Sequence, residues 1–258
     1  MRKIAAGNWK MNGTAEDLDE IRKLIAAHPK PRCEMLICPP ATLLSRLADV
    51  AAGSALMVGG QDCHPRLSGA HTGDISAQML RDAGATHVIL GHSERRQDHR
   101  ETDAMIRAKL ETALDQKLVA ILCVGETLAE REAGKTLAVV GEQIRAGLQN
   151  LSYTIDSLII AYEPVWAIGS GLTPTLEEIA EVHAFLRQTI RSGPLSSNGS
   201  GAGVALLYGG SVKPSNADAI FALPDVNGAL VGGASLRASD FGAIVQSLSA
   251  SCPDPTMP

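Results

Sequence analysis

The chain has 258 residues, of which 45% are hydrophobic, 3% aromatic and 20% charged, and its formal net charge at pH 7 is −5. This length suits a single α/β barrel, and the acidic balance argues against a nucleic-acid partner. No apolar run reaches the roughly 18 residues of a membrane span, and the chain enters an apolar run directly, so neither a membrane contact nor a signal peptide is expected.

The cysteines bear on the cellular compartment. There are five, at an odd count and without a CxxC pair or the spacing of a metal site: Cys33, Cys38, Cys63, Cys123 and Cys252. In a chain of this size, such cysteines are typical of reduced thiols in a cytoplasmic protein, where most serve in packing.

Short apolar runs recur along the chain. Eight of them are near-continuous, at residues 4–6, 35–38, 55–58, 87–90, 118–122, 158–161, 204–207 and 228–231. Continuous apolar runs, in contrast to alternating ones, are typical of parallel strands that are covered on both faces. We therefore predict eight buried parallel strands.

Segments with helical periodicity separate these runs. They lie at 14–27, 41–52, 76–83, 103–116, 135–149, 175–191, 214–222 and 239–248. The segment 175–191 is the clearest, because Thr175 can cap it, Glu177 and Glu178 lie in its first turn, and Ile179 and Val182 begin an apolar stripe.

Strand and helix thus alternate eight times. This order predicts a closed (β/α)8 barrel of a single domain, over residues 1–250. A doubly wound open sheet is the second choice, because no GxGxxG turn follows the first strand. The Gly- and Ser-rich segment 193–203 is expected to be an inert connection on the face away from the active site, and 251–258 a disordered tail.

In such a barrel the active site lies at the carboxyl ends of the strands. Glu163 lies at the carboxyl end of the strand formed by the sixth run, directly before Pro164, and the following loop holds Trp166 with Gly169 and Gly171. This composition is that of a hinged lid over a carboxylate, which makes Glu163 a candidate general base. An ordinary glycine-containing loop is the simpler interpretation of this segment alone.

The ends of the first and fourth runs add polar groups. Asn8 and Lys10 follow the first run, and His92 follows the fourth, next to Ser93. We expect Ser93 to cap a short helix and so to place His92 near the positive helix end, where a neutral imidazole is favoured. A surface lysine and a solvent-facing histidine remain the plain alternatives.

Paired glycines follow the last two runs. Gly209-Gly210-Ser211 comes after the seventh run, and Gly232-Gly233 after the eighth. Paired glycines let backbone amides approach an anion, and these two strand ends are where barrels hold phosphate. No metal-ligand cluster, nucleotide fingerprint or Ser/His/Asp grouping is evident. The inventory fits proton abstraction next to the carbonyl of a small phosphorylated sugar, without a cofactor or a metal.

Five stretches, in order, resemble the triosephosphate isomerase family over roughly residues 3–248. They are Gly-Asn-Trp-Lys-Met-Asn at 7–12, Gly-His-Ser-Glu-Arg-Arg at 91–96, Ala-Tyr-Glu-Pro-Val-Trp-Ala-Ile-Gly at 161–169, Tyr-Gly-Gly-Ser-Val at 208–212 and Gly-Gly-Ala-Ser-Leu at 232–236. The resemblance implies interconversion of dihydroxyacetone phosphate and glyceraldehyde 3-phosphate through an enediolate.

The resemblance also implies residue roles. Glu163 would be the base and a neutral His92 the electrophile, a pairing known for the family, with Lys10 and Asn8 in support. The phosphate would contact backbone amides of Gly169, Ser211, Gly232 and Gly233. Glu94 would order the lysine region, and Cys123 would pack nearby.

The segment 61–78 resembles the family's interdigitating loop, in which Thr72 would reach the neighbouring subunit's site, so a homodimer is implied. Two departures stand out. Leu172 replaces the usual lysine at the trailing end of the lid, which is expected to affect lid opening more than chemistry. Asp62 and His64 replace commoner residues in the dimer loop.

Two other functions remain open at this point. One is an isomerase of a four-carbon ketose phosphate on the same barrel, since pocket length depends on how the loops pack. The other is a barrel that binds phosphometabolites without catalysis. The intact set Lys10, His92 and Glu163 argues against the second.

Overall fold

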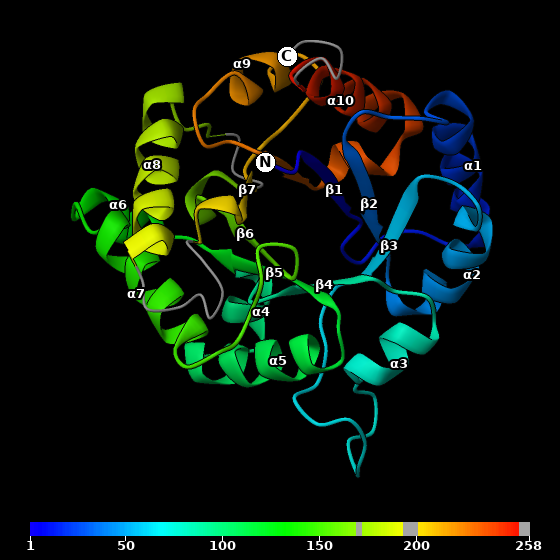
Figure 1. Ribbon diagram of the computed structural model, residues 1–258, viewed down its shortest axis with the longest axis horizontal. Coiled ribbons are helices and arrows are strands. Elements are labelled where there is room, and N and C mark those ends of the chain that lie inside the picture. Colours follow the sequence, from blue (N-terminus) through cyan, green and yellow to red (C-terminus); the bar gives the residue numbers. More distant parts are fainter. Residues whose placement is uncertain (169–171, 193–200, 253–258) are drawn as a thin grey trace.

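The computed structural model describes residues 1–168, 172–192 and 201–252 (Figure 1). Within them the predicted strands close into one parallel barrel, in the order β1 to β8 with β8 returning to β1. The strands are β1 Ile4–Asn8, β2 Glu34–Cys38, β3 Leu56–Gly60, β4 His87–Leu90, β5 Val119–Val124, β6 Leu158–Tyr162, β7 Ala205–Tyr208 and β8 Gly228–Val231. The closed barrel is confirmed, and the open-sheet alternative is wrong.

Helices surround the barrel (Figure 1). They are α1 Leu18–Ala27, α2 Ala41–Ala51, α3 Ala77–Asp82, α4 Ser93–Asp98, α5 Asp103–Asp115, α6 Leu128–Glu132, α7 Thr136–Leu148, α8 Leu176–Ser192, α9 Ala217–Phe221 and α10 Ala238–Ala250. Short 3-10 helices are η1 Ala15–Asp17, η2 Val165–Ala167, η3 Gly201–Gly203 and η4 Gly233–Leu236. The short α6 was not predicted, because five residues carry too little periodicity to detect.

Alternation along each strand divides the core into two parts. Ile159 and Ala161 point into the barrel, whereas Leu158, Ile160 and Tyr162 pack outward against the helices. Both faces are apolar because both are buried, which explains the continuous apolar runs in the sequence. Side chains two positions apart along a strand point to the same face. Glu163, two positions after Ala161, therefore points toward the barrel axis at the mouth of the barrel.

Some predictions fall outside the described residues. The lid residues 169–171, most of the connection 193–203 and the tail from 253 onward lie outside, while Gly201–Gly203 forms η3 and α10 ends at Ala250. None of the helices in the described part combines the length and apolarity needed to span a membrane.

Two buried histidines give the fold a dependence on pH. Burial lowers the pKa of His183, on α8, and of His87, on β4, each to about 4. In the unfolded chain these rings titrate near 6.5. The unfolded state therefore binds more protons below that value, and stability is lost as pH falls from about 6.5 towards 4.

We expect His183→Gln to remove part of this acid sensitivity. The ring Nδ1 lies 3.1 Å from the carbonyl of Asp225, to which it donates, and a glutamine amide can donate there at any pH. Between pH 7 and 4.5 the free energy of unfolding should fall by about 2–3 kcal/mol less in this variant than in wild type. Urea unfolding measures it, with the exposed His99→Gln as control. An unchanged pH slope in His183→Gln would contradict the assignment.

Candidate active site

A cleft of about 860 Å³ opens at the carboxyl ends of the strands. It brings together residues that lie far apart in the chain and that the sequence singled out: Asn8, Lys10, His92, Glu94, Glu163, Ser211, Gly232 and Gly233. Asn8 is the last residue of β1, and Glu163 directly follows β6. Both continue the inward parity of their strands, which is why closure of the barrel gathers them.

Glu163 is buried and held from two sides. Its side chain is about 3% exposed, and Oε1 lies 2.9 Å from Nε2 of His92. Its Oε2 accepts a hydrogen bond from the backbone N–H of Ser93 at 3.0 Å. A carboxylate held in this way must leave both partners before it can reach a substrate carbon.

His92, and not Ser93, caps α4, so the predicted capping role of Ser93 is wrong. Nδ1 of His92 accepts the backbone N–H of Glu94 at 3.2 Å, and Ser93 is the first helical residue. As the first helical residue, Ser93 has a backbone N–H without a partner inside the helix, and it donates this N–H to Glu163. Because Nδ1 accepts, the neutral ring carries its proton on Nε2, which faces the cleft and can donate to an oxygen.

The charge on His92 depends on its neighbour. Burial lowers the pKa of this imidazole, but the charge and hydrogen bond of Glu163, together with the charge of Glu94, raise it by more, so that the net shift is upward. The N–H of Glu94 opposes a second ring proton, because a protonated ring offers it no acceptor. When Glu163 turns away, burial, this N–H and the charge of Lys10 favour the neutral ring, against the carboxylate of Glu94.

Lys10 adopts a constrained backbone conformation. Its φ is +52°, which is uncommon for a residue with a side chain. Two hydrogen bonds hold it there, from its own N–H to Oδ1 of Asn8 at 2.9 Å and from Nε2 of Gln61 to its carbonyl at 2.8 Å. Its Nζ lies 2.6 Å from Oε1 of Glu94. The position of the ammonium in the cleft is therefore fixed from both ends.

Sequence reasoning missed two supporting residues. Gln61, noted only as the start of the dimer loop, also donates to the carbonyl of Cys38 at 2.9 Å. Glu126, which follows β5, is fully buried and accepts from Nε1 of Trp166 at 2.9 Å and from the hydroxyl of Tyr162 at 3.2 Å. Its place just after a strand end was the one available signal. Through Trp166, Glu126 holds the described start of the predicted lid.

Cys123 lies on the inward face of β5 and is buried. Burial raises the pKa of its thiol well above the usual value, and the Glu163 carboxylate raises it further. The thiol is therefore neutral and serves in packing beneath the carboxylate.

The two glycine-rich loops both line the cleft, and they follow the neighbouring strands β7 and β8. The loop after β8 leads into η4, whose N-terminal N–H groups begin at Gly233. A side chain at Gly232 would place its Cβ 3.6 Å from Cε of Lys10, so the backbone here lies directly beside the lysine. Of the predicted anion contacts, Gly169 lies outside the described residues.

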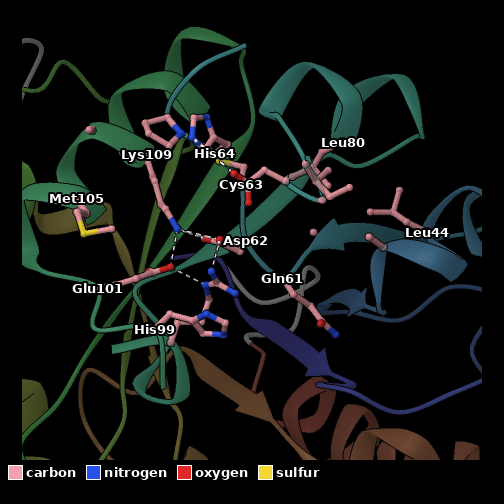
Figure 2. Close-up of a pocket in the computed structure, with 18 of the residues that line it drawn as sticks. Leu44, Gln61, Asp62, Cys63, His64, Leu80, His99, Glu101, Met105 and Lys109 are labelled. Carbon is pink, nitrogen blue, oxygen red and sulfur yellow. Dashed lines mark hydrogen bonds and ion pairs between the residues drawn. The ribbon is translucent and has the colours of Figure 1, made fainter. Parts of the chain in front are cut away.

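A second cleft, of about 710 Å³, lies under the loop between β3 and α3. Figure 2 shows Asp62, Glu101 and Lys109 converging in it, with Nζ of Lys109 2.8 Å from Asp62 and 2.6 Å from Glu101. Burial raises the pKa of Asp62, and Lys109 opposes that shift. The unusual Asp62 is thus paired within its own chain. The loop that also carries Thr72 projects from the barrel (Figure 1).

A closed (β/α)8 barrel with a buried carboxylate, an imidazole and an ammonium at its mouth, beside two glycine-rich loops, is an acid–base enzyme of the aldose–ketose isomerase kind. The family model described as triosephosphate isomerase matches residues 3–248. The chain belongs to the triosephosphate isomerase family.

Individual relatives agree. The chain is 58% identical over 250 residues to a triosephosphate isomerase of Ruegeria sp. (strain TM1040), covering 97% of this chain and 99% of that one. It is 59% identical over 249 residues to that of Ruegeria pomeroyi, with 96% and 97% covered. The crystal structure of triosephosphate isomerase from Bartonella henselae superposes with a TM-score of 0.88 at 49% identity, covering 96% of this chain and 99% of that chain.

Proposed function

We infer that the protein interconverts dihydroxyacetone phosphate and D-glyceraldehyde 3-phosphate by moving one proton through an enediolate. The observation that carries this inference is the buried pair of Glu163 and His92, 2.9 Å apart in a cleft that also holds Lys10 and both glycine-rich loops. These are the parts that proton transfer next to a carbonyl requires.

Glu163 is proposed as the base. It takes a proton from carbon 1 of the ketose, the C–H electron pair forms the carbon 1–carbon 2 double bond, and the negative charge moves to the carbonyl oxygen. Return of the proton to carbon 2, with transfer of a proton between the two oxygens, gives the aldehyde. To act, Glu163 must first leave Nε2 of His92 and the N–H of Ser93.

His92 and Lys10 are proposed to stabilise the developing oxyanion. Once Glu163 turns to the substrate, Nε2–H of His92 is free to donate, and Nδ1 remains tied to Glu94. Lys10 adds a positive charge, which is held in place by Glu94, by the hydrogen bond that its N–H donates to Asn8 and by the one that its carbonyl accepts from Gln61. Donors that are fixed before the reaction need no reorganisation when the charge forms.

A coupled assay with D-glyceraldehyde 3-phosphate tests the reaction, alongside a four-carbon ketose phosphate at the same concentration. We expect turnover of the triose phosphate to exceed that of the longer substrate by at least 100-fold, since the phosphate and the reacting carbons must occupy their sites at once. Equal turnover, or turnover of the four-carbon substrate alone, would contradict the assignment.

The phosphate is proposed to contact the backbone amides of Ser211, Gly232 and Gly233, and that of Gly169. We expect Gly232→Val to raise KM for glyceraldehyde 3-phosphate and the inhibition constant of inorganic phosphate by roughly tenfold, about 1.4 kcal/mol. The new Cβ would lie in ordinary contact with Cε of Lys10, at 3.6 Å, and the two methyl groups would extend beyond it. Turnover of unphosphorylated D-glyceraldehyde is the control and should not change. Unaltered phosphate inhibition would refute the contact.

A homodimer is also proposed, in which Thr72 reaches the neighbouring subunit's site. The loop that carries it projects from the barrel (Figure 1), and exposed apolar side chains lie on or near it, with Ile75 36%, Met79 53% and Met105 46% exposed. Apolar groups gathered at a projecting loop favour association with a second copy. Sedimentation velocity at micromolar concentration should give twice the chain mass. A fully active monomer would contradict the proposal.

The remaining parts of the proposal follow from the same chemistry. Residues 1–250 would form the catalytic barrel, with 251–258 as a tail outside it. The protein would act in the cytoplasm on a small phosphorylated triose, with no cofactor, metal or nucleic acid needed for turnover. To test that no metal is needed, the protein can be dialysed exhaustively against a chelator, and we expect its activity to survive.

A further inference from the structure

One arginine joins the ends of two neighbouring strands. Arg96, on α4, is largely buried, with 17% of its side chain exposed. Its Nε donates to the carbonyl of Gly91 at 2.9 Å, and its Nη2 donates to the carbonyl of Cys123 at 3.2 Å. Gly91 directly follows β4, and Cys123 belongs to β5. A single guanidinium therefore binds the backbones of both strands at the carboxyl end of the barrel.

These bonds begin where the pairing of the two strands ends. β4 and β5 pair in parallel register up to Leu90 and Leu122. The residues that follow, Gly91 and Cys123, are both buried, and Gly91 takes a φ of +71°, outside the strand region. Buried carbonyls at such a point need donors other than the neighbouring strand. Arg96 supplies one to each, and so extends the link between the strands past the last backbone pair.

The two strand ends hold the proposed reacting groups. Gly91 directly precedes His92. On β5, Val124 directly follows the residue whose carbonyl the arginine binds, and its own carbonyl accepts the N–H of Glu163 at 2.8 Å. Arg96 therefore lies between the backbone that carries the imidazole and the backbone that holds the carboxylate.

Neighbouring groups keep the guanidinium itself in place. Its Nη1 lies 2.6 Å from Oδ1 of Asp103, the first residue of α5. A Cβ added to Gly91 would lie 3.0 Å from Cδ1 of Ile106 and 3.3 Å from Nη2 of Arg96, so the backbone at this point is tightly enclosed. A planar guanidinium can meet three acceptors at fixed angles, whereas a lysine ammonium is a point charge on a flexible stem. Because Asp103 offsets the positive charge, the directional bonds of the arginine are its main contribution.

We propose that Arg96 is a positioning residue, which fixes His92 relative to Glu163 by binding the ends of β4 and β5 to each other. This inference rests on the proposed isomerase function, in which Glu163 takes the proton while His92 donates to the substrate oxygen. The two groups lie 2.9 Å apart, so a shift of one strand end against the other changes how both meet the substrate. A misplacement of about 1 Å can lower a rate on the order of 100-fold.

Arg96→Lys tests this role, because it keeps the charge but cannot meet all three acceptors. We expect kcat with glyceraldehyde 3-phosphate to fall by about 10- to 100-fold, from the changed geometry of the reacting groups. KM should change by less than about threefold, because the glycine-rich loops proposed to hold the phosphate follow other strands, β7 and β8. A kcat within about threefold of wild type, or a loss confined to KM, would overturn the proposal.

Arg107→Lys is the matched control. Arg107 also donates to a backbone carbonyl, that of Gln149 at 2.8 Å, and pairs with Glu111 at 3.2 Å, but it does not line the catalytic cleft. Its replacement should leave kcat and KM unchanged. A fall in kcat as large as that of Arg96→Lys would show that any lost arginine contact has this effect, which refutes a specific role of Arg96.

A measurement on wild type keeps the test independent of how the variant folds. In NMR spectra the Nε–H of Arg96 should exchange with solvent at least about tenfold more slowly than that of the exposed Arg191, with and without saturating inorganic phosphate. Equally fast exchange would show that the bond to Gly91 is not held, and would overturn the proposal. Wild type without turnover of glyceraldehyde 3-phosphate would overturn the proposed function and this role with it. An active wild type with an equally active Arg96→Lys would overturn this role alone.

Discussion

Replacing Glu163 by glutamine is expected to lower kcat by roughly 10²–10⁴-fold, with KM changed little. The amide is close to the carboxylate in size, so it should occupy the same buried position, where its oxygen can accept from only one of the two donors, Nε2–H of His92 or the N–H of Ser93. What it loses is the ability to take a proton. Steady-state kinetics with glyceraldehyde 3-phosphate measures this effect.

Two companion measurements separate loss of the base from loss of structure. Exchange of the substrate's α-proton with deuterated solvent should fall in parallel with turnover, because both need the same proton abstraction. Glu163→Asp should keep part of the activity, since it moves the carboxylate back by one methylene group but retains the base. If Glu163→Gln turns over within tenfold of wild type, another group is the base.

The second large effect is expected from Lys10→Met, which removes the ammonium but keeps a chain of similar length. We expect kcat/KM to fall by roughly 10²–10³-fold, as for the loss of one fixed donor to a developing oxyanion. Stability should change little. The partner of the ammonium, Glu94, is 45% exposed in its side chain, so water can solvate it once the ion pair is gone.

Lys213→Met is the matched control for this prediction. Lys213 lines the same cleft and carries the same charge, but it follows the seventh strand instead of the first. If Lys10 acted only through the general positive potential of the cleft, kcat/KM would fall similarly in both variants. Both losses would then become smaller at high salt. A fixed role of Lys10 predicts a large loss in Lys10→Met alone, still present at high salt. Equal losses in the two variants would remove Lys10 from the oxyanion site.

The structure also shows why the site needs support from distant parts of the chain. Gln61 holds the carbonyl of Lys10 across 51 positions in sequence, and Glu94 holds its ammonium across 84. Glu126 binds Trp166 across 40 positions. Gln61, Glu94 and Glu126 each lie in a segment that follows a strand, at the same end of the barrel. Positioning of the reacting groups is therefore shared among loops that meet only once the barrel has closed.

The sequence by itself determined the elements and where chemistry could lie along them. Continuous apolar runs require burial on both faces, and their alternation with helical periods admits few arrangements, so the strands and the barrel followed from local patterns. The same patterns placed Asn8 and Glu163 at strand ends, and paired glycines after the last two strands. Residue type and order were sufficient to locate the site, because the carboxyl ends of all strands in a parallel barrel lie on the same face.

Only the tertiary structure decided which side chains touch. It showed that His92 caps its own helix, that Gln61 fixes Lys10 in a left-handed conformation, and that Glu126 binds the start of the lid. It also brought Asp62 and Glu101 to Lys109 in the second cleft. Such contacts depend on the paths of the loops and on closure of the barrel. These bring together residues that lie far apart in sequence. No local periodicity encodes them.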